Sequence, residues 1–403
     1  MALDLHKVAN SISAMTSELA CSKSEQAERL RGALKIFGSP GDIGAFKNKI
    51  AASKTSWLVA EIIDGLNNKY FPADSPDEFI VLATDGSQID VDRHRGARCY
   101  LINIGTVKLK YGKNPEAVLK NLPLLFSREE DMAVRPDICT PGREMLVEGS
   151  LLGIKRTIEE FNHLAGLCAE LPVGASALAL VDGSLIMWGL LSKDYPDYII
   201  NSVLDEGVLK HMDSIRQMNP GRRVALASYI SFTRSTDVAN ALRVLVCPHE
   251  TADCDRHCTG IEAGKRPCAG LDGIHDRDIF WQWLSNGERS EVFASMSRIN
   301  CTRYGKHRVH FYYLKSGDEI ARVEVPEWVA RDSELLNLSH ALVVSQCGKG
   351  QGYPVALSEA HEQAVVTGAD RENFYRLVEE CLAGKKLPVS VSAKSFSKKT
   401  RWV

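Results

Sequence analysis

Two segments of the chain repeat one pattern, an apolar run that ends in Asp-Gly-Ser. The first, "VLATDGSQID", contains Asp85, and the second, "LALVDGSLIM", contains Asp182. Short apolar runs bounded by a turn signal are typical of buried strands. Ligands of open α/β sheets bind at the ends of strands. The repetition therefore predicts that two carboxylates lie at one rim of a sheet.

Two converging aspartates favour a divalent cation, because Mg²⁺ and Mn²⁺ prefer oxygen ligands. Taken alone, either copy is equally explained as an ordinary Asp-Gly turn. A third carboxylate is available on a helix that we expect over residues 142–169, where Glu144 and Glu148 are one turn apart. The alternative for both glutamates is a solvated helix edge.

Strand-like and helical patterns alternate along the chain, which predicts an α/β fold. Residues 1–75 are expected to be helical, with a second helix over 46–66. A larger domain is expected over 76–380, and it includes the hairpin "HRVHFYYLKSGDEIARVEVPEW" with its turn at "SGDE". The segment 384–403 is a basic tail, which either binds single-stranded DNA or is simply solvated.

Composition excludes some classes of protein. The chain has 403 residues and a formal net charge of −2, so no overall basicity indicates nucleic-acid binding. No apolar run has the length of a signal peptide or a membrane span. Eleven cysteines without a secretion signal argue against a disulfide framework. We therefore expect a cytoplasmic protein with reduced thiols and no membrane partner.

Four of the cysteines lie in one loop-like segment, residues 247–270, with the spacing C-x6-C-x3-C-x9-C. They are Cys247, Cys254, Cys258 and Cys268. Four thiolates suit a structural Zn²⁺ ion or an iron–sulfur cluster, and His249 and His257 offer substitute ligands. The spacing lacks the tight C-x2-C pair of common zinc modules, so four unrelated thiols are the alternative.

Six motifs, in their order along the chain, resemble those of the NurA nuclease family. They are "LATDGSQ", "REMLVEGSLL", "LALVDGSLIMWG", "SYISFTRSTDV", "ARVEVPEW" and "GYPVALSEAH". The resemblance covers residues 75–375 and says little about the cysteine segment. It implies an RNase H-like mixed-sheet core flanked by helices. In this chain an N-terminal helical region and an inserted cysteine-rich loop are added to that core.

The same resemblance implies an activity and a set of residues. The activity is 5′–3′ DNA exonuclease and single-strand endonuclease cleavage, supported by Mn²⁺ or Mg²⁺, alongside a HerA-like hexameric ATPase. The acidic positions match Asp85 and Asp182, and the intervening acid is placed at Glu148, with Glu144 as the alternative register. The remaining positions, a tyrosine after the next strand and a C-terminal histidine, match Tyr229 and His361.

These residue types fit phosphodiester hydrolysis, in which metals held by carboxylates position water and stabilise charge on the phosphoryl group. A histidine such as His361 suits metal ligation or proton transfer, and Tyr229 suits contact with a phosphate. The alternatives are a packed histidine and a core tyrosine. Arg322 and Glu324, at period two on the hairpin, either reach the acidic site or pair with each other.

The sequence thus leads to a metal-dependent DNA nuclease that acts as a homodimer with a HerA-like ATPase. Its role would be DNA end resection and repair, or defence against foreign DNA. The sequence contains no G-x4-G-K-[ST] loop, so ATP hydrolysis would come from the partner. The competing hypotheses are a catalytically inactive DNA-binding or scaffold subunit, and a phosphatase that uses the same acids.

Overall fold

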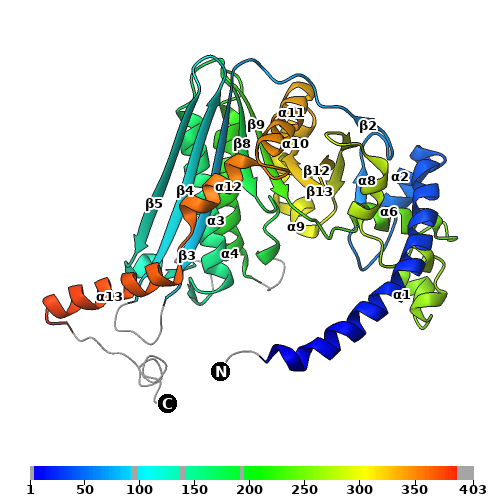
Figure 1. The fold of residues 1–403 in the computed structure, drawn as a ribbon, viewed down its shortest axis with the longest axis horizontal. Helices are drawn as coiled ribbons and strands as arrows, with labels where there is room; N and C mark the ends of the chain where they lie inside the picture. Colours follow the sequence, from blue (N-terminus) through cyan, green and yellow to red (C-terminus); the bar gives the residue numbers. More distant parts are fainter. Residues whose placement is uncertain (1–3, 92–97, 137–141, 191–194, 388–403) are drawn as a thin grey trace. The chain divides into compact units, whose positions relative to one another are not determined.

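The computed structural model describes residues 4–91, 98–136, 142–190 and 195–387 (Figure 1). The chain has an α/β fold with a large mixed sheet flanked by helices. It divides into two compact units that alternate along the sequence. The first unit comprises Met1–Pro72, Ile230–Thr302 and Arg308–Val323, and the second comprises Ala73–Tyr229, Arg303–His307 and Glu324–Val403. Most of the predicted basic tail, from residue 388 onward, lies outside the described residues.

The sheet of the second unit contains strands in the order β9-β8-β3-β4-β5. The strands β3, β8 and β9 are parallel to one another, and β4 and β5 add to β3 in antiparallel fashion. The parallel strands are almost completely buried, as expected where helices cover both faces. Their bounds are β3 (Phe79–Ile89), β4 (Tyr100–Tyr111), β5 (Glu116–Phe126), β8 (Ser176–Asp182) and β9 (Arg223–Ile230).

Helices cover this sheet, and α3 and α12 both pack against β3 and β4. The other helices of the unit precede or follow these two in the chain. The bounds are η1 (Glu129–Asp131), α3 (Ser150–Ala169), η2 (Trp188–Leu190), α4 (Asp197–Ile200), η3 (Asn201–Leu209), α5 (Lys210–Gln217), η6 (Gly305–His307), α10 (Glu327–Ala330), α11 (Ser333–Lys349), α12 (Val355–Ala364) and α13 (Gly368–Gly384). A separate two-stranded sheet joins β6 (Ala133–Val134) to β7 (Met145–Leu146).

Two glycines show that α3 and α12 lie on opposite faces of β3. A Cβ atom at Gly86 would lie 2.6 Å from Glu160 on α3. Gly105 of β4 pairs with Asp85 of β3. A Cβ atom at Gly105 would lie 2.1 Å from the backbone oxygen of Ala360 on α12. Because paired residues share a face and successive residues alternate, Asp85 points to the α12 side and Gly86 faces α3.

The first unit has strands in the order β1-β11-β12-β13, and β10 joins β12 to β2. The strands are β1 (Ala60–Ile62), β2 (Lys69–Tyr70), β10 (Arg289–Ser290), β11 (Phe293–Ser295), β12 (Val309–Ser316) and β13 (Glu319–Pro326). The helices are α1 (Leu5–Gly38), α2 (Ile43–Ala51), α6 (Asp237–Val246), α7 (Cys254–Cys258), η4 (Ala263–Lys265), η5 (Ala269–Leu271), α8 (Asp276–Trp283) and α9 (Arg298–Arg303). Aromatic rings fill its core, among them Phe37, edge-on to Phe280 at 5.5 Å.

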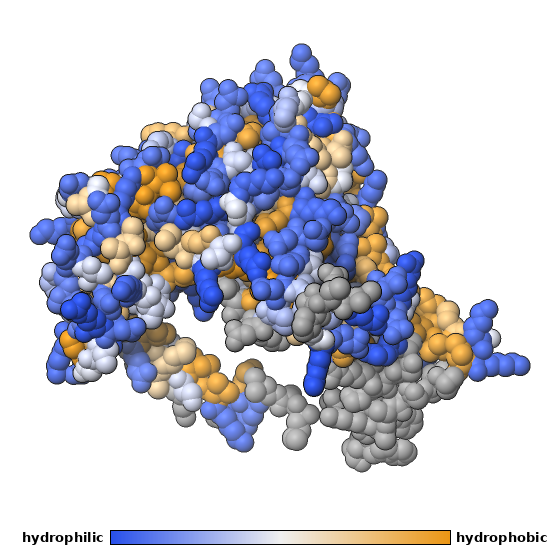
Figure 2. Space-filling view, turned by 180° about the vertical axis from the view of Figure 1, so that it is seen from behind, coloured by the Kyte–Doolittle hydropathy of each residue, from blue (hydrophilic) through white to orange (hydrophobic). Residues whose placement is uncertain are grey.

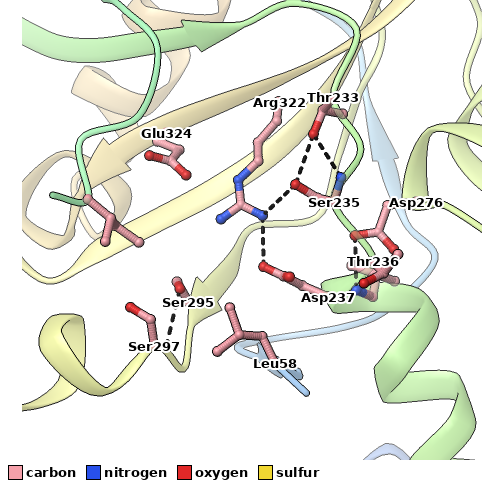
Figure 3. Close-up of polar contacts among 12 residues, drawn as sticks. Leu58, Thr233, Ser235, Thr236, Asp237, Asp276, Ser295, Ser297, Arg322 and Glu324 are labelled. Atoms are coloured by element: carbon pink, nitrogen blue, oxygen red, sulfur yellow. Dashed lines mark hydrogen bonds and ion pairs between the residues drawn. The ribbon is translucent and has the colours of Figure 1, made fainter. Parts of the chain in front are cut away.

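A buried ion pair lies beside this core (Figure 3). The Arg322 guanidinium is 2.8 Å from the Asp237 carboxylate and lies 3.5 Å from the centre of the Phe311 ring. Next to it, the completely buried Asp276 accepts hydrogen bonds from the amides that open α6 and from Tyr313. Burial, together with the charge of Asp237, raises the pKa of Asp276 to about 6. Arg322 therefore has a structural partner within its own unit.

Three predicted helices differ from the structure. The helix expected over 46–66 ends at Ala51, and the β-rich residues that follow form β1. The helix expected from residue 142 begins at Ser150, because Gly149 has φ +55°, in the left-handed region that interrupts a right-handed helix. The helical pattern of residues 356–381 predicts one helix, but the structure has two, since the Thr367 side chain caps a new start at α13. The hairpin with its turn near "SGDE" is confirmed.

No helix in the part of the chain that the structure describes is both long and apolar enough to cross a membrane.

Candidate active site

The two Asp-Gly-Ser aspartates lie on adjacent parallel strands of the second unit. Thr84 of β3 pairs with Val181 of β8, and the next residue of each strand is Asp85 and Asp182. Asp182 is the last residue of its strand. The two carboxylates are close enough that the charge of Asp85 raises the pKa of Asp182. The two aspartates therefore lie side by side as predicted, but only Asp182 ends its strand, because β3 continues through Asp-Gly-Ser to Ile89 and pairs with β4 there.

Glu160 of α3 is a third carboxylate near them, on the face of β3 that α3 covers. It is buried, and burial raises the pKa of the Glu160 carboxyl to about 7. Arg156, 3.1 Å away, lowers this pKa, whereas the charges of Asp85 and Asp182 raise it. The Thr84 hydroxyl donates to the backbone oxygen of Glu160 at 3.0 Å, which anchors α3 against β3. The site therefore contains three acids and one arginine.

Asp85 is held by two further contacts. The backbone N–H of Gly86 donates to its Oδ1 atom at 2.7 Å, and Nδ1 of His361 is 2.8 Å from its Oδ2 atom. His361 lies on α12, the helix that covers this face of β3. The structure therefore brings the predicted histidine to the predicted aspartate.

Asp182 contacts a tyrosine that sequence reasoning missed. The Tyr353 hydroxyl donates to Asp182 Oδ1 at 3.0 Å. Partial removal from water raises the pKa of Asp182, the hydrogen bond from Tyr353 lowers it, and the Asp85 charge raises it. The signal was present in the sequence, because Tyr353 is the second residue of the motif "GYPVALSEAH" that also contains His361.

The predicted tyrosine, Tyr229, packs against Tyr353. It is fully buried, and its ring is edge-on to the Tyr353 ring with centroids 5.5 Å apart. Its hydroxyl donates to the backbone oxygen of Gly352 at 3.3 Å. Tyr229 therefore supports the segment that carries Tyr353, and it pairs in register with Asp182 on the neighbouring strand.

Glu148 and Glu144, the two residues expected to supply the third acid, both precede α3. Glu148 precedes α3, in the turn before Ser150. A helix rises 1.5 Å per residue, so Glu160 lies about 15 Å along the axis from Ser150. Glu144 is exposed at the surface and pairs with Arg135 at 3.1 Å.

Glu324 holds the loop that follows Asp182. Its buried carboxylate accepts hydrogen bonds from the Ser184 hydroxyl at 2.8 Å and from the Leu185 N–H at 2.9 Å. The Tyr304 hydroxyl donates to the backbone oxygen of Leu185 at 2.9 Å. These contacts fix the Asp-Gly-Ser turn, so Glu324 acts on the site through the position of Asp182.

The donor set suits a divalent cation, although the side chains do not yet surround one. Among the described residues, no three His, Cys, Asp or Glu side chains come close enough together to hold a metal ion. Carboxylate oxygens are nevertheless the ligands that Mg²⁺ and Mn²⁺ prefer. The raised pKa values of Glu160 and Asp182 reflect, beside burial, negative charge that a cation would neutralise.

In the first unit, the four predicted cysteines line one pocket. Cys247 follows α6, Cys254 and Cys258 begin and end α7, and Cys268 precedes η5. All four are free thiols and are half-buried. Burial raises the pKa of the Cys254 thiol, and the three other cysteines raise it further.

The family model of the NurA domain matches residues 79–366, which is more than half of the chain. No curated protein shows significant similarity to it. The matched range contains both Asp-Gly-Ser strands, α3 and α12. The chain therefore belongs to the NurA family, whose members are related to nucleases and associated with nucleic-acid binding.

Proposed function

We propose that the protein is a metal-dependent DNA nuclease that hydrolyses phosphodiester bonds at the acidic site. The observation that carries the proposal is the convergence of Asp85 and Asp182 on adjacent parallel strands, with Glu160 beside them. Carboxylates from several elements at one strand end are suited to a hard cation and to a phosphate ligand of that cation.

In this proposal Asp85, Asp182 and Glu160 would hold Mn²⁺ or Mg²⁺. The bound metal supplies an activated water and stabilises charge on the phosphoryl oxygens. His361, through Nδ1 against Asp85, orients that carboxylate and offers its ring for proton transfer. The Tyr353 hydroxyl orients Asp182.

The finer properties are proposals carried by the family resemblance. They are an RNase H-like core, 5′–3′ exonuclease and single-strand endonuclease cleavage, a HerA-like ATPase as partner, a homodimer, and a cytoplasmic role in end resection and repair or in defence. The arrangement of three antiparallel strands, β5-β4-β3, followed by the two parallel strands β8 and β9 supports the proposed core.

The test is cleavage of 5′- and 3′-labelled single- and double-stranded DNA with Mn²⁺, Mg²⁺ or EDTA. Asp85→Asn should lower cleavage more than about 100-fold, since even outer-shell partners of a metal are worth 10–100-fold. Asp77→Asn, an exposed acid that precedes β3, is the matched control and should retain activity. The labels report polarity at the same time.

Three outcomes would contradict the proposal, and the last two would each favour a competing function. Full cleavage by Asp85→Asn would remove the acidic site from the mechanism. Binding of DNA without cleavage, with both metals and a HerA-like ATPase present, would indicate a binding or scaffold subunit. Release of phosphate from small phosphomonoesters without DNA cleavage would indicate a phosphatase.

A further inference from the structure

The cysteine pocket of the first unit is a preformed set of soft ligands. Its four thiols come from a loop, a short helix and a second loop, and they converge although many residues separate the first from the last. Cys254 and Cys258 are one helical turn apart and so share a face of α7. No disulfide links any of the four. Four free thiols that line one pocket are the arrangement expected of a bound metal centre.

The backbone around the pocket is tied to the N-terminal part of the unit. The Lys54 N–H donates to the Ala252 oxygen at 2.8 Å, and the Cys254 N–H donates to the Lys54 oxygen at 3.1 Å. Asp253 caps α7 by accepting the Arg256 N–H at 3.0 Å. These hydrogen bonds fix the backbone that carries the cysteines to the rest of the first unit.

Apolar and charged side chains surround the thiols, and Arg243 among them is paired with Asp272 at 2.7 Å. Trp57, Ala252 and Pro267 line the pocket together with Arg243. The Arg243 guanidinium lies 4.9 Å from the centre of the Trp57 ring and donates to the Cys268 sulfur at 3.7 Å. Apolar walls and N–H donors to sulfur are the features that tune iron–sulfur clusters, whose total charge with four thiolates is negative.

Four thiolates are the ligand set of both candidate groups, a Zn²⁺ ion and an iron–sulfur cluster. The N–H donor from Arg243 to the Cys268 sulfur and the apolar wall of Trp57, Ala252 and Pro267 favour the cluster, because such donors and walls tune its potential.

We propose that Cys247, Cys254, Cys258 and Cys268 bind an iron–sulfur cluster that holds residues 247–268 to the first unit. Each thiol loses its proton to solvent when its sulfur binds an iron of the incoming cluster, and it displaces the terminal ligand that this iron carried before. The proposal is independent of the acidic site, because none of these residues belongs to it.

The test is a metal and spectroscopic analysis of the full chain, expressed with ample iron and purified without oxygen. We expect iron and acid-labile sulfide in similar amounts, and a broad visible absorption that dithionite bleaches. Cys254→Ser should lose the absorption and most of the iron. Cys301→Ser, an exposed cysteine of the same unit outside the pocket, is the matched control and should keep both.

Two results would overturn the proposal. One is zinc at one ion per chain with no iron, which would make the pocket a zinc centre. The other is a wild-type chain that takes up no cluster after anaerobic reconstitution with iron and sulfide. Both are measured on wild-type protein, so a cysteine variant that fails to fold does not affect the decision. Neither measurement depends on DNA cleavage.

Arg243→Gln provides a second readout, because it keeps all four thiols. The variant should keep the absorption and show a more negative reduction potential, since it removes a positive charge and an N–H donor from the Cys268 sulfur. An unchanged potential would contradict a cluster placed against Arg243.

Discussion

Glu160 combines burial, an adjacent arginine and two nearby aspartates in one carboxyl group. If it is the third acid of the site, Glu160→Gln should reduce DNA cleavage about 100-fold or more, because a neutral amide binds a cation more weakly than a carboxylate. Glu148→Gln should leave cleavage within a few-fold of wild type. The assay is metal-dependent cleavage of single-stranded DNA. A large loss of cleavage in Glu148→Gln and none in Glu160→Gln would indicate Glu148 as the ligand.

His307 is a buried residue with a predicted effect on stability. Burial lowers the pKa of His307 to about 4, and the carboxylate of Asp213 opposes this shift. The Trp328 indole N–H donates to Nδ1 at 3.3 Å, which requires the unprotonated ring nitrogen. Because the folded pKa lies below the ordinary value of 6.5, the unfolded chain takes up a proton more readily. Stability from this residue is therefore complete above pH 6.5 and is lost as the pH falls toward 4.

The expected loss between pH 7 and pH 4 is about 3 kcal/mol, from 1.36 kcal/mol per pKa unit. It is measured as the difference in urea unfolding free energy between wild type and His307→Gln, whose side chain does not titrate. Other groups titrate equally in both proteins and cancel in this difference. Parallel pH profiles for the two proteins would show that His307 does not carry the effect.

The N-terminal half of α1 carries an exposed apolar stripe. The stripe consists of Leu5, Val8, Ile12, Met15 and Leu19, all exposed. Their alternating spacing of three and four residues is that of a left-handed coiled coil. Figure 2 shows apolar surface along this helix. Further along, α1 packs into the core of the first unit through Ala33 and Phe37, so only its N-terminal half presents the stripe.

We predict that this stripe pairs with the same helix of a second copy, which would give the proposed homodimer. Ile12→Asp places a charge in the centre of the seam and should shift the protein toward monomer. Ala14→Asp adds the same charge on another face of the helix and should not. Light scattering after size exclusion, or sedimentation, measures the mass over a range of concentrations. A concentration-independent monomer for wild type would contradict the pairing.

For the whole chain, a cation at the acidic site should act as a stabilising ligand. Mn²⁺ at about 100 times its dissociation constant adds about 2.7 kcal/mol to the unfolding free energy, since it binds the folded state alone. The double variant Asp85→Asn, Asp182→Asn should lose this gain. Without metal, it should unfold no more easily than wild type, because it removes two charges that oppose ionisation of Glu160. Thermal unfolding with Mn²⁺ or EDTA measures both effects, and an equal gain in both proteins would place the cation elsewhere.

Local properties of the chain were enough to predict much of this protein. Alternating and apolar runs identified β3, β8 and the hairpin of β12 and β13, because side chains that face a sheet repeat with period two. The repeated Asp-Gly-Ser drew attention to Asp85 and Asp182, although the expected strand end holds for Asp182 alone and β3 continues past Asp85 to Ile89. The ordered motifs predicted the NurA family, and the family match confirms it.

Contacts between distant segments decided the rest. The acid of α3 that reaches the aspartates depends on where the helix begins, which Gly149 sets through its positive φ, and on how α3 packs against β3. Glu148 and Glu160 look alike along the sequence, but only packing distinguishes their positions. In the same way, Tyr353 reaches Asp182 only because a loop before α12 returns to the end of β8. Side-chain position at such a site is a property of several packed elements, and no single stretch of sequence contains it.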